Sequence, residues 1–287
     1  MIEFADMGRA EDNICRPRSD PASRLGAEIN AFRQWSKGQG WSTEIDSPNE
    51  GVPFGKAIEV LLQRGPMLLA ICLNNGYYTR SAIHRLLYFA SEFSDQVTVF
   101  FTDGPSVHNY IALGHTKAEA LRKARKQRNR LQNACNEAIA LIKQRREFAV
   151  FFIDWNEIYR REDFKSEYEK LDLLYSTNDA FRSDLVFETR EVLASHPSIS
   201  EEGLRYAVGY PLEELAFLLT YNKIAAETAH SPLQALDFAY VYHLRWPLLE
   251  KLVQGKYDGI LRSNLGFAIV RIVNELNSLT HSRAAAE

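Results

Sequence analysis

The sequence predicts an α/β protein: one Rossmann-like domain in which helices flank a mostly parallel sheet. Short apolar runs without charged residues recur along the chain, as is typical of parallel strands buried on both faces. Helical patterns separate these runs and give the order β-α-β-α-β-α. The 287 residues are 46% hydrophobic, which is enough for one large core, and no repeat or low-complexity tract divides the chain.

Composition sets the expected domain limits. Residues 1–50 are polar and interrupted by glycine and proline, so we expect a partly disordered N-terminal extension, apart from a short helix over 25–35. Residues 51–276 are expected to form the Rossmann-like domain, and residues 277–287 a C-terminal tail.

The first expected strand is the apolar run from Met67 to Cys72, between Pro66 and a turn rich in asparagine and glycine. A short helix over 56–63 precedes this strand, and a helix over 80–89 follows it at once. The other elements of this half are a buried strand over 97–101, a long helix over 117–146 and a third buried strand over 148–153.

The second half is expected to begin with a polar helical stretch over 155–194. Ser200 is a favoured N-cap, so a helix should start after it. Proline is tolerated at the first position of a helix, so we expect Tyr210 to end this segment and a new one to run over 211–221. The remaining elements are an aromatic-rich strand over 238–244, a helix from Pro247 to near Gly255 and a strand over 266–273.

Several common classes of site are absent from the sequence. It contains no G-x-G-x-x-G, no G-x-x-x-x-G-K-[ST] and no H-E-x-x-H, and its seven histidines are scattered without ligand spacing. We therefore expect no cofactor and no metal. Three cysteines without a paired or C-x-x-C spacing indicate a reducing cytoplasm. There is no signal peptide pattern and no apolar run near the roughly 20 residues that span a bilayer.

A basic stripe interrupts the otherwise balanced charge of the chain, whose formal net charge is −3. Its six cations, in ten residues without a carboxylate, are Arg122, Lys123, Arg125, Lys126, Arg128 and Arg130. Such a stripe is either a solvated helix face or the contact surface of a polyanionic partner. Mutual repulsion among the six cations favours the partner.

Three further features carry side chains with useful chemistry. Cys72 lies at the carboxyl end of a strand, where open α/β sheets bind ligands. Tyr210 and Glu214 have the i,i+4 spacing that places them on one helical face, and Tyr242-His243 ends the strand over 238–244. Taken singly, the first two features are more typical of a buried structural thiol and of a solvated glutamate beside a half-buried tyrosine, and the third is equally typical of a hydrogen-bonded core pair.

Taken together, the features resemble the cyclodipeptide synthases, which use aminoacyl-tRNAs to make 2,5-diketopiperazines. The first strand of that family ends in a motif similar to G-x-S-x-G-N-S-Y, and residues 70–77, Ala-Ile-Cys-Leu-Asn-Asn-Gly-Tyr, fall on it. Cys72 thus occupies the position of the nucleophilic serine. Ala70 and Asn74 replace glycines, and Gly76 replaces a serine.

The other motifs of the family occur in the same order. Tyr210 and Glu214 match its Tyr-x-x-x-Glu pair, and the arginine-rich helix matches the basic stripe. Asn75, Tyr242 and His243 together are similar to one of its two subgroups. The resemblance spans residues 61–273 and implies a fold like the catalytic domain of class I aminoacyl-tRNA synthetases.

The resemblance implies a ping-pong reaction of two aminoacyl-tRNAs through a thioester on Cys72, without ATP or metal. Glu214 would bind the α-ammonium group of the substrate, Tyr210 would orient it and Tyr242 would transfer protons. The basic stripe would hold the tRNA phosphates on a cytoplasmic, monomeric enzyme. The remaining substrate-binding positions would be Asn75, His243, Leu68 and Ala70.

Three alternatives remain at this stage. A class I synthetase relative is disfavoured because no HIGH-like or KMSKS-like signature is present. A catalytically inactive aminoacyl-tRNA-binding protein of the same fold is compatible with the altered turn. An arginine-using synthase is the third, since Asp103 and Asp154 at strand ends are suited to pair with a guanidinium. They are equally suited to cap turns, and we favour capping.

Overall fold

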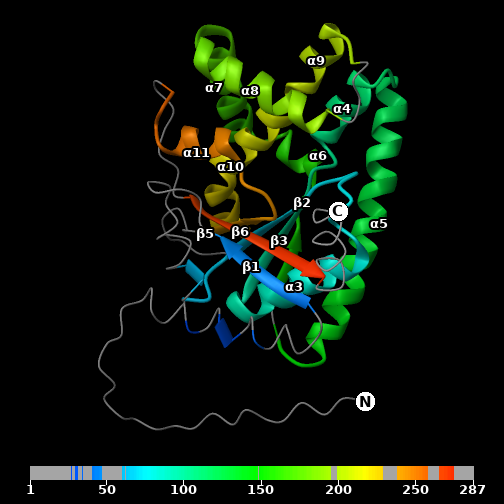
Figure 1. The fold of residues 1–287 in the computed structure, drawn as a ribbon, viewed down its shortest axis with the longest axis vertical. Coiled ribbons are helices and arrows are strands. Elements are labelled where there is room, and N and C mark those ends of the chain that lie inside the picture. The colour runs from blue at the N-terminus through cyan, green and yellow to red at the C-terminus, as the bar shows by residue number, and fades with distance from the viewer. Residues whose placement is uncertain are drawn as a thin grey trace, which may run out of the picture.

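The computed structural model describes residues 41–46, 60–61, 63–147, 149–194, 199–228, 238–257 and 265–274, together with positions 27, 30, 31 and 34 (Figure 1). Its elements, in chain order, are β1 (Trp41–Asp46), β2 (Met67–Ile71), α3 (Arg80–Phe93), β3 (Gln96–Phe101), α4 (Ser106–Ala112), α5 (Lys117–Lys143), β4 (Ala149–Phe152), α6 (Trp155–Ile158), α7 (Glu162–Thr177), α8 (Asp179–Val192), α9 (Glu201–Ala207), α10 (Gly209–Thr228), β5 (Phe238–Tyr242), α11 (Pro247–Val253) and β6 (Leu265–Asn274).

The described strands form one sheet in the order β1-β6-β5-β2-β3-β4. The strands from β6 to β4 pair in parallel, and β1 joins the edge antiparallel to β6. The chain winds outward from β2 to β3 and β4 on one side, and β5 then returns to pair with the other side of β2. The carboxyl ends of β2 and β5 therefore flank a topological switch point, which is where open α/β sheets bind ligands.

Two hydrophobic cores cover the two faces of the sheet. One core packs α3 and α5 against one face, and the other packs residues of α6, α7, α8, α10 and α11 against the opposite face (Figure 1). Strand β2 divides its side chains between them, with Leu69 in the first core and Leu68 in the second. This arrangement explains why its sequence is a continuous apolar run rather than an alternating one.

The structure confirms the α/β class and the main helices and strands, with adjustments at breaks and ends. Helix α5 begins with a capping box in which Thr116 and Glu119 satisfy each other's backbone amides. The polar stretch over 155–194 is three helices, because the chain breaks at Arg161 and Asn178. The expected break at Tyr210 is wrong: α10 runs unbroken from Gly209, so Tyr210 lies in its first turn.

Two strand predictions need correction. Strand β4 was expected to be buried, but it is the sheet edge beside β3, and Phe151 is 37% exposed. Strand β1 was missed, because residues 41–46 were assigned to the N-terminal extension. Their alternating sequence, Trp-Ser-Thr-Glu-Ile-Asp, is typical of an antiparallel strand and not of the continuous apolar runs that identified the parallel strands.

Other expectations are only partly covered by the described residues. The four described positions within 25–35 are helical, as are positions 60 and 61 of the helix expected over 56–63. The expected tail over 277–287 lies outside the described residues. Within the described part of the chain, no helix has both the length and the apolar character needed to cross a membrane.

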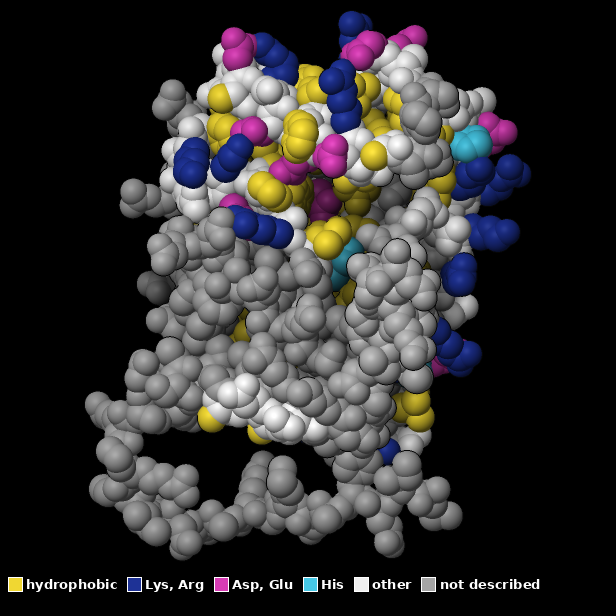
Figure 2. Space-filling model, viewed as in Figure 1, with side chains coloured by type: hydrophobic (Ala, Val, Ile, Leu, Met, Phe, Trp, Pro, Cys, Tyr) yellow, Lys and Arg dark blue, Asp and Glu magenta, His cyan; other side chains and the backbone are white. Residues whose placement is uncertain are grey.

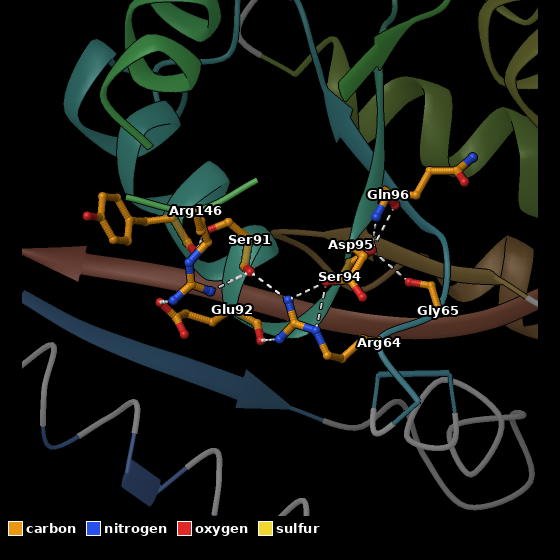
Figure 3. Close-up of polar contacts among 9 residues, drawn as sticks. Arg64, Gly65, Ser91, Glu92, Ser94, Asp95, Gln96 and Arg146 are labelled. Atoms are coloured by element: carbon orange, nitrogen blue, oxygen red, sulfur yellow. Dashed lines mark hydrogen bonds and ion pairs between the residues drawn. The ribbon is translucent and has the colours of Figure 1, made fainter. Parts of the chain in front are cut away.

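At the amino-terminal edge of the sheet, two arginines hold the end of α3 (Figure 3). Arg64 donates to the carbonyl oxygens of Ser91 and Glu92 and forms a 2.6 Å ion pair with Asp95. Arg146 donates to the same Ser91 carbonyl and pairs with Glu92 at 2.7 Å. The last carbonyls of a helix lack intrahelical partners and carry partial negative charge, so these guanidinium groups stabilise the terminus.

Candidate active site

A thiol and two phenols meet at the switch point of the sheet. Cys72 directly follows β2, and Tyr242 is the last residue of β5, the parallel neighbour of β2. The Cys72 Sγ lies 3.0 Å from the Tyr242 hydroxyl oxygen, and the Tyr210 hydroxyl donates to the same sulfur at 3.6 Å. Only 7% of Cys72 is exposed. The thiol is therefore held by two hydroxyl groups that are themselves proton donors and acceptors.

The turn after Cys72 explains one departure from the family motif. Asn74 has φ +59°, the left-handed region that glycine adopts freely and asparagine tolerates better than most residues. Its side-chain amide donates to the Tyr110 hydroxyl at 2.6 Å, which fixes the turn against α4. Gly76 has open space where a Cβ would lie, so its position tolerates the serine of the family motif.

His243 supports this turn from behind. Its Nε2 lies 3.1 Å from the amide nitrogen of Asn75, and its Nδ1 lies 2.8 Å from the Tyr78 hydroxyl. Since that hydroxyl donates to the Ala70 carbonyl, Nδ1 donates to it and Nε2 accepts from Asn75. The ring of Tyr77 stacks on the imidazole with centroids 4.4 Å apart. His243 thus orients Asn75.

Glu214 is a buried carboxyl group whose charge acts on the Cys72 thiol. It is only 4% exposed, and its Oε1 accepts from the Tyr240 hydroxyl at a long 3.4 Å. Burial raises its pKa to about 8. Burial also raises the pKa of Cys72 to about 12, with a smaller increase from the charge of Glu214, while the hydrogen bonds of Tyr242 and Tyr210 act in the opposite direction. These surroundings therefore favour a neutral thiol.

The same pocket disfavours ionised phenols. Burial raises the pKa values of Tyr210 and Tyr242 well above 10, and Cys72 and Glu214 add to both increases. Every charged form in this cluster is an anion, so each ionisation makes the next one harder. A cation placed beside Glu214 would relieve this repulsion, and the pocket is consequently suited to a positively charged ligand group.

A cavity of about 750 Å³ opens from this cluster toward the surface. Its outer part is lined by α8 and by the segment leading into α11, where Phe187, Val192 and Leu244 are 64%, 67% and 45% exposed. Figure 2 shows this face hollowed between hydrophobic side chains, with acidic side chains inside the hollow. The two cations of the lining are paired, Arg245 with Glu250 and Lys251 with Asp184.

The structure brings together only part of the predicted site. Cys72, Tyr210, Glu214, Tyr242 and Asn75 line the cavity. The other predicted substrate-binding residues lie outside its lining: Leu68 and Ala70 are fully buried in the second core, and His243 backs the turn.

The two aspartates considered for arginine recognition also lie outside the cavity lining. Asp154 accepts from the amide of Asn156 and caps α6, as the capping interpretation predicted. Asp103 lies 3.7 Å from Arg128, and burial raises its pKa to about 6.

Helix α5 presents most of the basic stripe to solvent. Five of its six cations are exposed, namely Arg122, Lys123, Arg125, Lys126 and Arg130. Lysine and arginine side chains project along the side of the molecule where α5 runs (Figures 1 and 2). Arg128 is the exception, because it turns inward toward Asp103 and the Ile153 carbonyl. It therefore does not belong to the exposed basic face.

Sequence reasoning missed two contributors to the site. Thr102, which follows β3, accepts from the backbone amide of Leu73 at 3.2 Å, and its hydroxyl also lowers the pKa of the Cys72 thiol. Tyr240 lies two residues before Tyr242 on β5 and donates to Glu214. Thr102 carried a usable signal, because it ends the strand next to the one that ends at Cys72. For Tyr240, the only signal in the sequence was its position in an aromatic-rich strand.

Comparisons with known proteins find relatives in one family. The family model described as cyclodipeptide synthase matches residues 51–272. The cyclo(L-leucyl-L-leucyl) synthase of Bacillus subtilis is 24% identical over 234 residues, covering 80% of this chain and 90% of that protein.

Solved structures show the same fold. A Mycobacterium tuberculosis protein, whose structure relates cyclodipeptide synthetases to type I tRNA synthetases, superposes with a TM-score of 0.60 at 17% identity, over 81% of this chain and 93% of that one. A cyclodipeptide synthase from Candidatus Glomeribacter gigasporarum, solved bound to Phe-tRNAPhe, gives a TM-score of 0.51 at 16% identity, over 71% and 87%. The predicted class I synthetase-like fold is confirmed.

Proposed function

This chain belongs to the cyclodipeptide synthase family, and we propose that it joins the aminoacyl groups of two aminoacyl-tRNAs into a cyclic dipeptide through a thioester on Cys72. The observation that carries the proposal is the buried thiol within reach of two tyrosine hydroxyls, beside the buried carboxyl group of Glu214, which forms no ion pair with any residue that the structure describes. Aminoacyl-tRNA as substrate is supported by the relative that was solved with Phe-tRNAPhe.

In the first step, the Cys72 sulfur attacks the ester carbonyl of one aminoacyl-tRNA. The new bond joins carbon to sulfur, and the bond between that carbon and the ribose oxygen breaks. Because burial raises the thiol pKa to about 12, the proton has to leave during the attack. The Tyr242 hydroxyl, 3.0 Å away, is placed to pass this proton toward the departing ribose oxygen.

Glu214 supplies the counter-charge for the bound substrate. The α-ammonium group of an aminoacyl ester carries one positive charge, and pairing with it favours the ionised carboxylate that burial otherwise disfavours. Tyr210 lies one turn earlier on the same face of α10, and its hydroxyl donates to the Cys72 sulfur. Together the two residues hold the reacting carbonyl beside the thiol.

In the second step, the amine of a second aminoacyl-tRNA attacks the thioester carbonyl. This forms the first peptide bond and returns the proton to the Cys72 sulfur. The free amine of the resulting dipeptidyl-tRNA then attacks the remaining ester, which closes the ring and releases the second tRNA. Both carbonyls arrive already activated as esters, so neither ATP nor a metal is needed. The 750 Å³ cavity has room for both aminoacyl groups.

The exposed cations of α5 are the proposed contact for tRNA phosphates. Phosphate contacts position a nucleic acid without reading its sequence, so the amino acids have to be selected elsewhere. Asp103 and Asp154 lie outside the cavity lining, which removes the residues on which arginine use rested. We propose instead that the apolar rim of Phe187, Val192 and Leu244 receives an apolar side chain.

The test is product analysis with a mixed pool of aminoacyl-tRNAs. We expect mass spectrometry to detect a cyclic dipeptide, and its mass to identify the amino acids used. Intact-protein mass spectrometry with one charged tRNA should also show an aminoacyl adduct on Cys72 that hydroxylamine removes. Retained tRNA binding with neither product nor adduct would instead support the alternative of an inactive aminoacyl-tRNA-binding protein.

A further inference from the structure

Helix α4 contacts both halves of the catalytic site. On one side, the backbone amide of Ser106, the first residue of α4, donates to the Thr102 carbonyl at 2.9 Å, and the Thr102 hydroxyl accepts from the amide of Leu73. One turn further along α4, the Tyr110 hydroxyl accepts from Asn74 at 2.6 Å. The turn that carries the thiol is thus tied to α4 at two points.

On its other side, α4 holds the catalytic helix α10 through His108. The imidazole of His108 packs against Gly209, where an added Cβ would lie 2.5 Å from the ring atoms Nδ1 and Cε1. One turn along α10, the His108 Nε2 donates to the Glu213 Oε1 at 2.9 Å. The Tyr159 hydroxyl donates to the other oxygen of the same carboxylate at 2.6 Å.

The two contacts of His108 fall on the residues directly before the catalytic pair. Gly209 precedes Tyr210, and Glu213 precedes Glu214. The two contacted residues therefore have the same i,i+4 spacing as the catalytic pair and lie beside it on one helix. Side-chain tips lie about 5–6 Å from a helix axis, so a rotation of about 10° moves them by about 1 Å. A displacement of about 1 Å in a catalytic group can cost about 100-fold in rate.

We propose that His108 is a positioning residue, which sets the rotation of α10 so that Tyr210 and Glu214 face Cys72. Helix α4 then acts as a spacer between the thiol turn and the catalytic pair. The inference rests on the proposed reaction for its kinetic consequence, but its geometric consequence is independent of that reaction.

Gly209→Ala tests the positioning role of His108 without removing any functional group. Alanine favours the helix more than glycine does, so the backbone of α10 is not weakened. The added methyl group has to displace the imidazole or rotate α10. We expect kcat for cyclic dipeptide formation to fall by about 10-fold or more, while the KM for aminoacyl-tRNA changes less than about twofold.

A double-variant cycle distinguishes positioning from general packing. If the methyl group acts by pushing against the ring, then Gly209→Ala should add little to the loss already caused by His108→Ala. His108→Gln, which retains a donor for Glu213, should recover part of the rate. Lys223→Gln, at an exposed position of the same helix, is the matched control and should keep wild-type kcat. Full additivity, or wild-type kcat in both single variants, would overturn the inference.

A second readout needs no substrate. The rate at which iodoacetamide alkylates Cys72, followed by peptide mass mapping, reports how closely α10 covers the thiol. We expect alkylation to become about threefold faster in His108→Ala and Gly209→Ala, measured on folded protein, because moving α10 away exposes the sulfur, and the greater distance from the Glu214 charge favours the thiolate. An alkylation rate equal to that of the wild type in both variants would contradict the positioning role of His108. If the wild type forms no cyclic dipeptide but the variants are alkylated faster, the proposed reaction is rejected and the positioning role of His108 is supported.

Discussion

The two edges of the sheet treat charge in opposite ways. At the amino-terminal edge, the charged side chains of Arg64 and Arg146 meet carboxylates and helix carbonyls, and all remain partly solvated (Figure 3). At the carboxyl edge, the buried Glu214 meets a thiol and phenols. At the first edge each of these charges has a partner of opposite charge. At the second edge Glu214 forms no ion pair among the described residues, and the proposed substrate would bring the positive charge.

Removing the thiol should have the largest effect at the carboxyl edge. We expect Cys72→Ala to lower the rate of cyclic dipeptide formation by about 1000-fold or more and to abolish the aminoacyl adduct, because no other group can form the thioester. Cys72→Ser is the matched control and should retain measurable product, since the hydroxyl occupies the position found in the family. Unchanged turnover in Cys72→Ala would eliminate the covalent route.

Replacing Glu214 sharpens the contrast between the two edges. Glu214→Gln keeps the shape of the side chain and removes its charge, so we expect kcat/KM for aminoacyl-tRNA to fall by about 100-fold. The pKa of this carboxyl is about 8 in the folded protein and close to 4.5 when unfolded, so folding favours its neutral form. Its contribution to stability is therefore complete below pH 4.5 and is lost as the pH rises to about 8.

The glutamine variant avoids this loss. Its melting temperature relative to the wild type should thus increase from pH 4.5 to pH 8 and level off above it. Thermal unfolding measured across this range checks the sign. A difference between the two proteins that does not change with pH would show that Glu214 is already ionised in the folded protein without substrate.

The exposed face of α5 should give an intermediate effect. We expect charge reversal at Arg125 to raise the KM for aminoacyl-tRNA about 10-fold at low salt and less at high salt, because phosphate contacts release counterions. Arg128→Gln is the contrasting variant, since its side chain faces Asp103 and not the solvent. It should leave the salt dependence of KM unchanged. If the KM for aminoacyl-tRNA depends on salt equally in both variants and the wild type, the basic stripe is only a solvated surface.

The amino-terminal edge should give the smallest effect on catalysis. We expect Arg64→Ala to lower the free energy of unfolding by about 1–2 kcal/mol, because it removes charge-assisted hydrogen bonds that are partly exposed. The kcat of the folded enzyme should stay within about twofold of the wild type. Chemical denaturation and product assays on the same preparation measure both quantities. A large loss of kcat at full folding would show that the two edges are coupled.

Local patterns predicted the elements because burial and periodicity are read within short windows. The apolar run at Met67–Ile71 and the i,i+4 spacing of Tyr210 and Glu214 both appear in the structure as expected. The misjudged strands were those at the sheet edges, and the misjudged helix start was the break expected at Tyr210. Strand β1 lacks a continuous apolar run, and the apolar sequence of β4 does not show that this strand lies at an edge.

The sequence by itself determined the α/β class, the long helix that carries the basic stripe, the i,i+4 spacing of Tyr210 and Glu214, and the residue types at each family motif. The tertiary structure alone decided that β5 pairs with β2, which brings Tyr242 to the sulfur of Cys72 across a separation of 170 residues. It also turned Arg128 inward and placed His108 against Gly209. Periodicity encodes how each segment is buried, but which segments become neighbours depends on the packing of the whole chain.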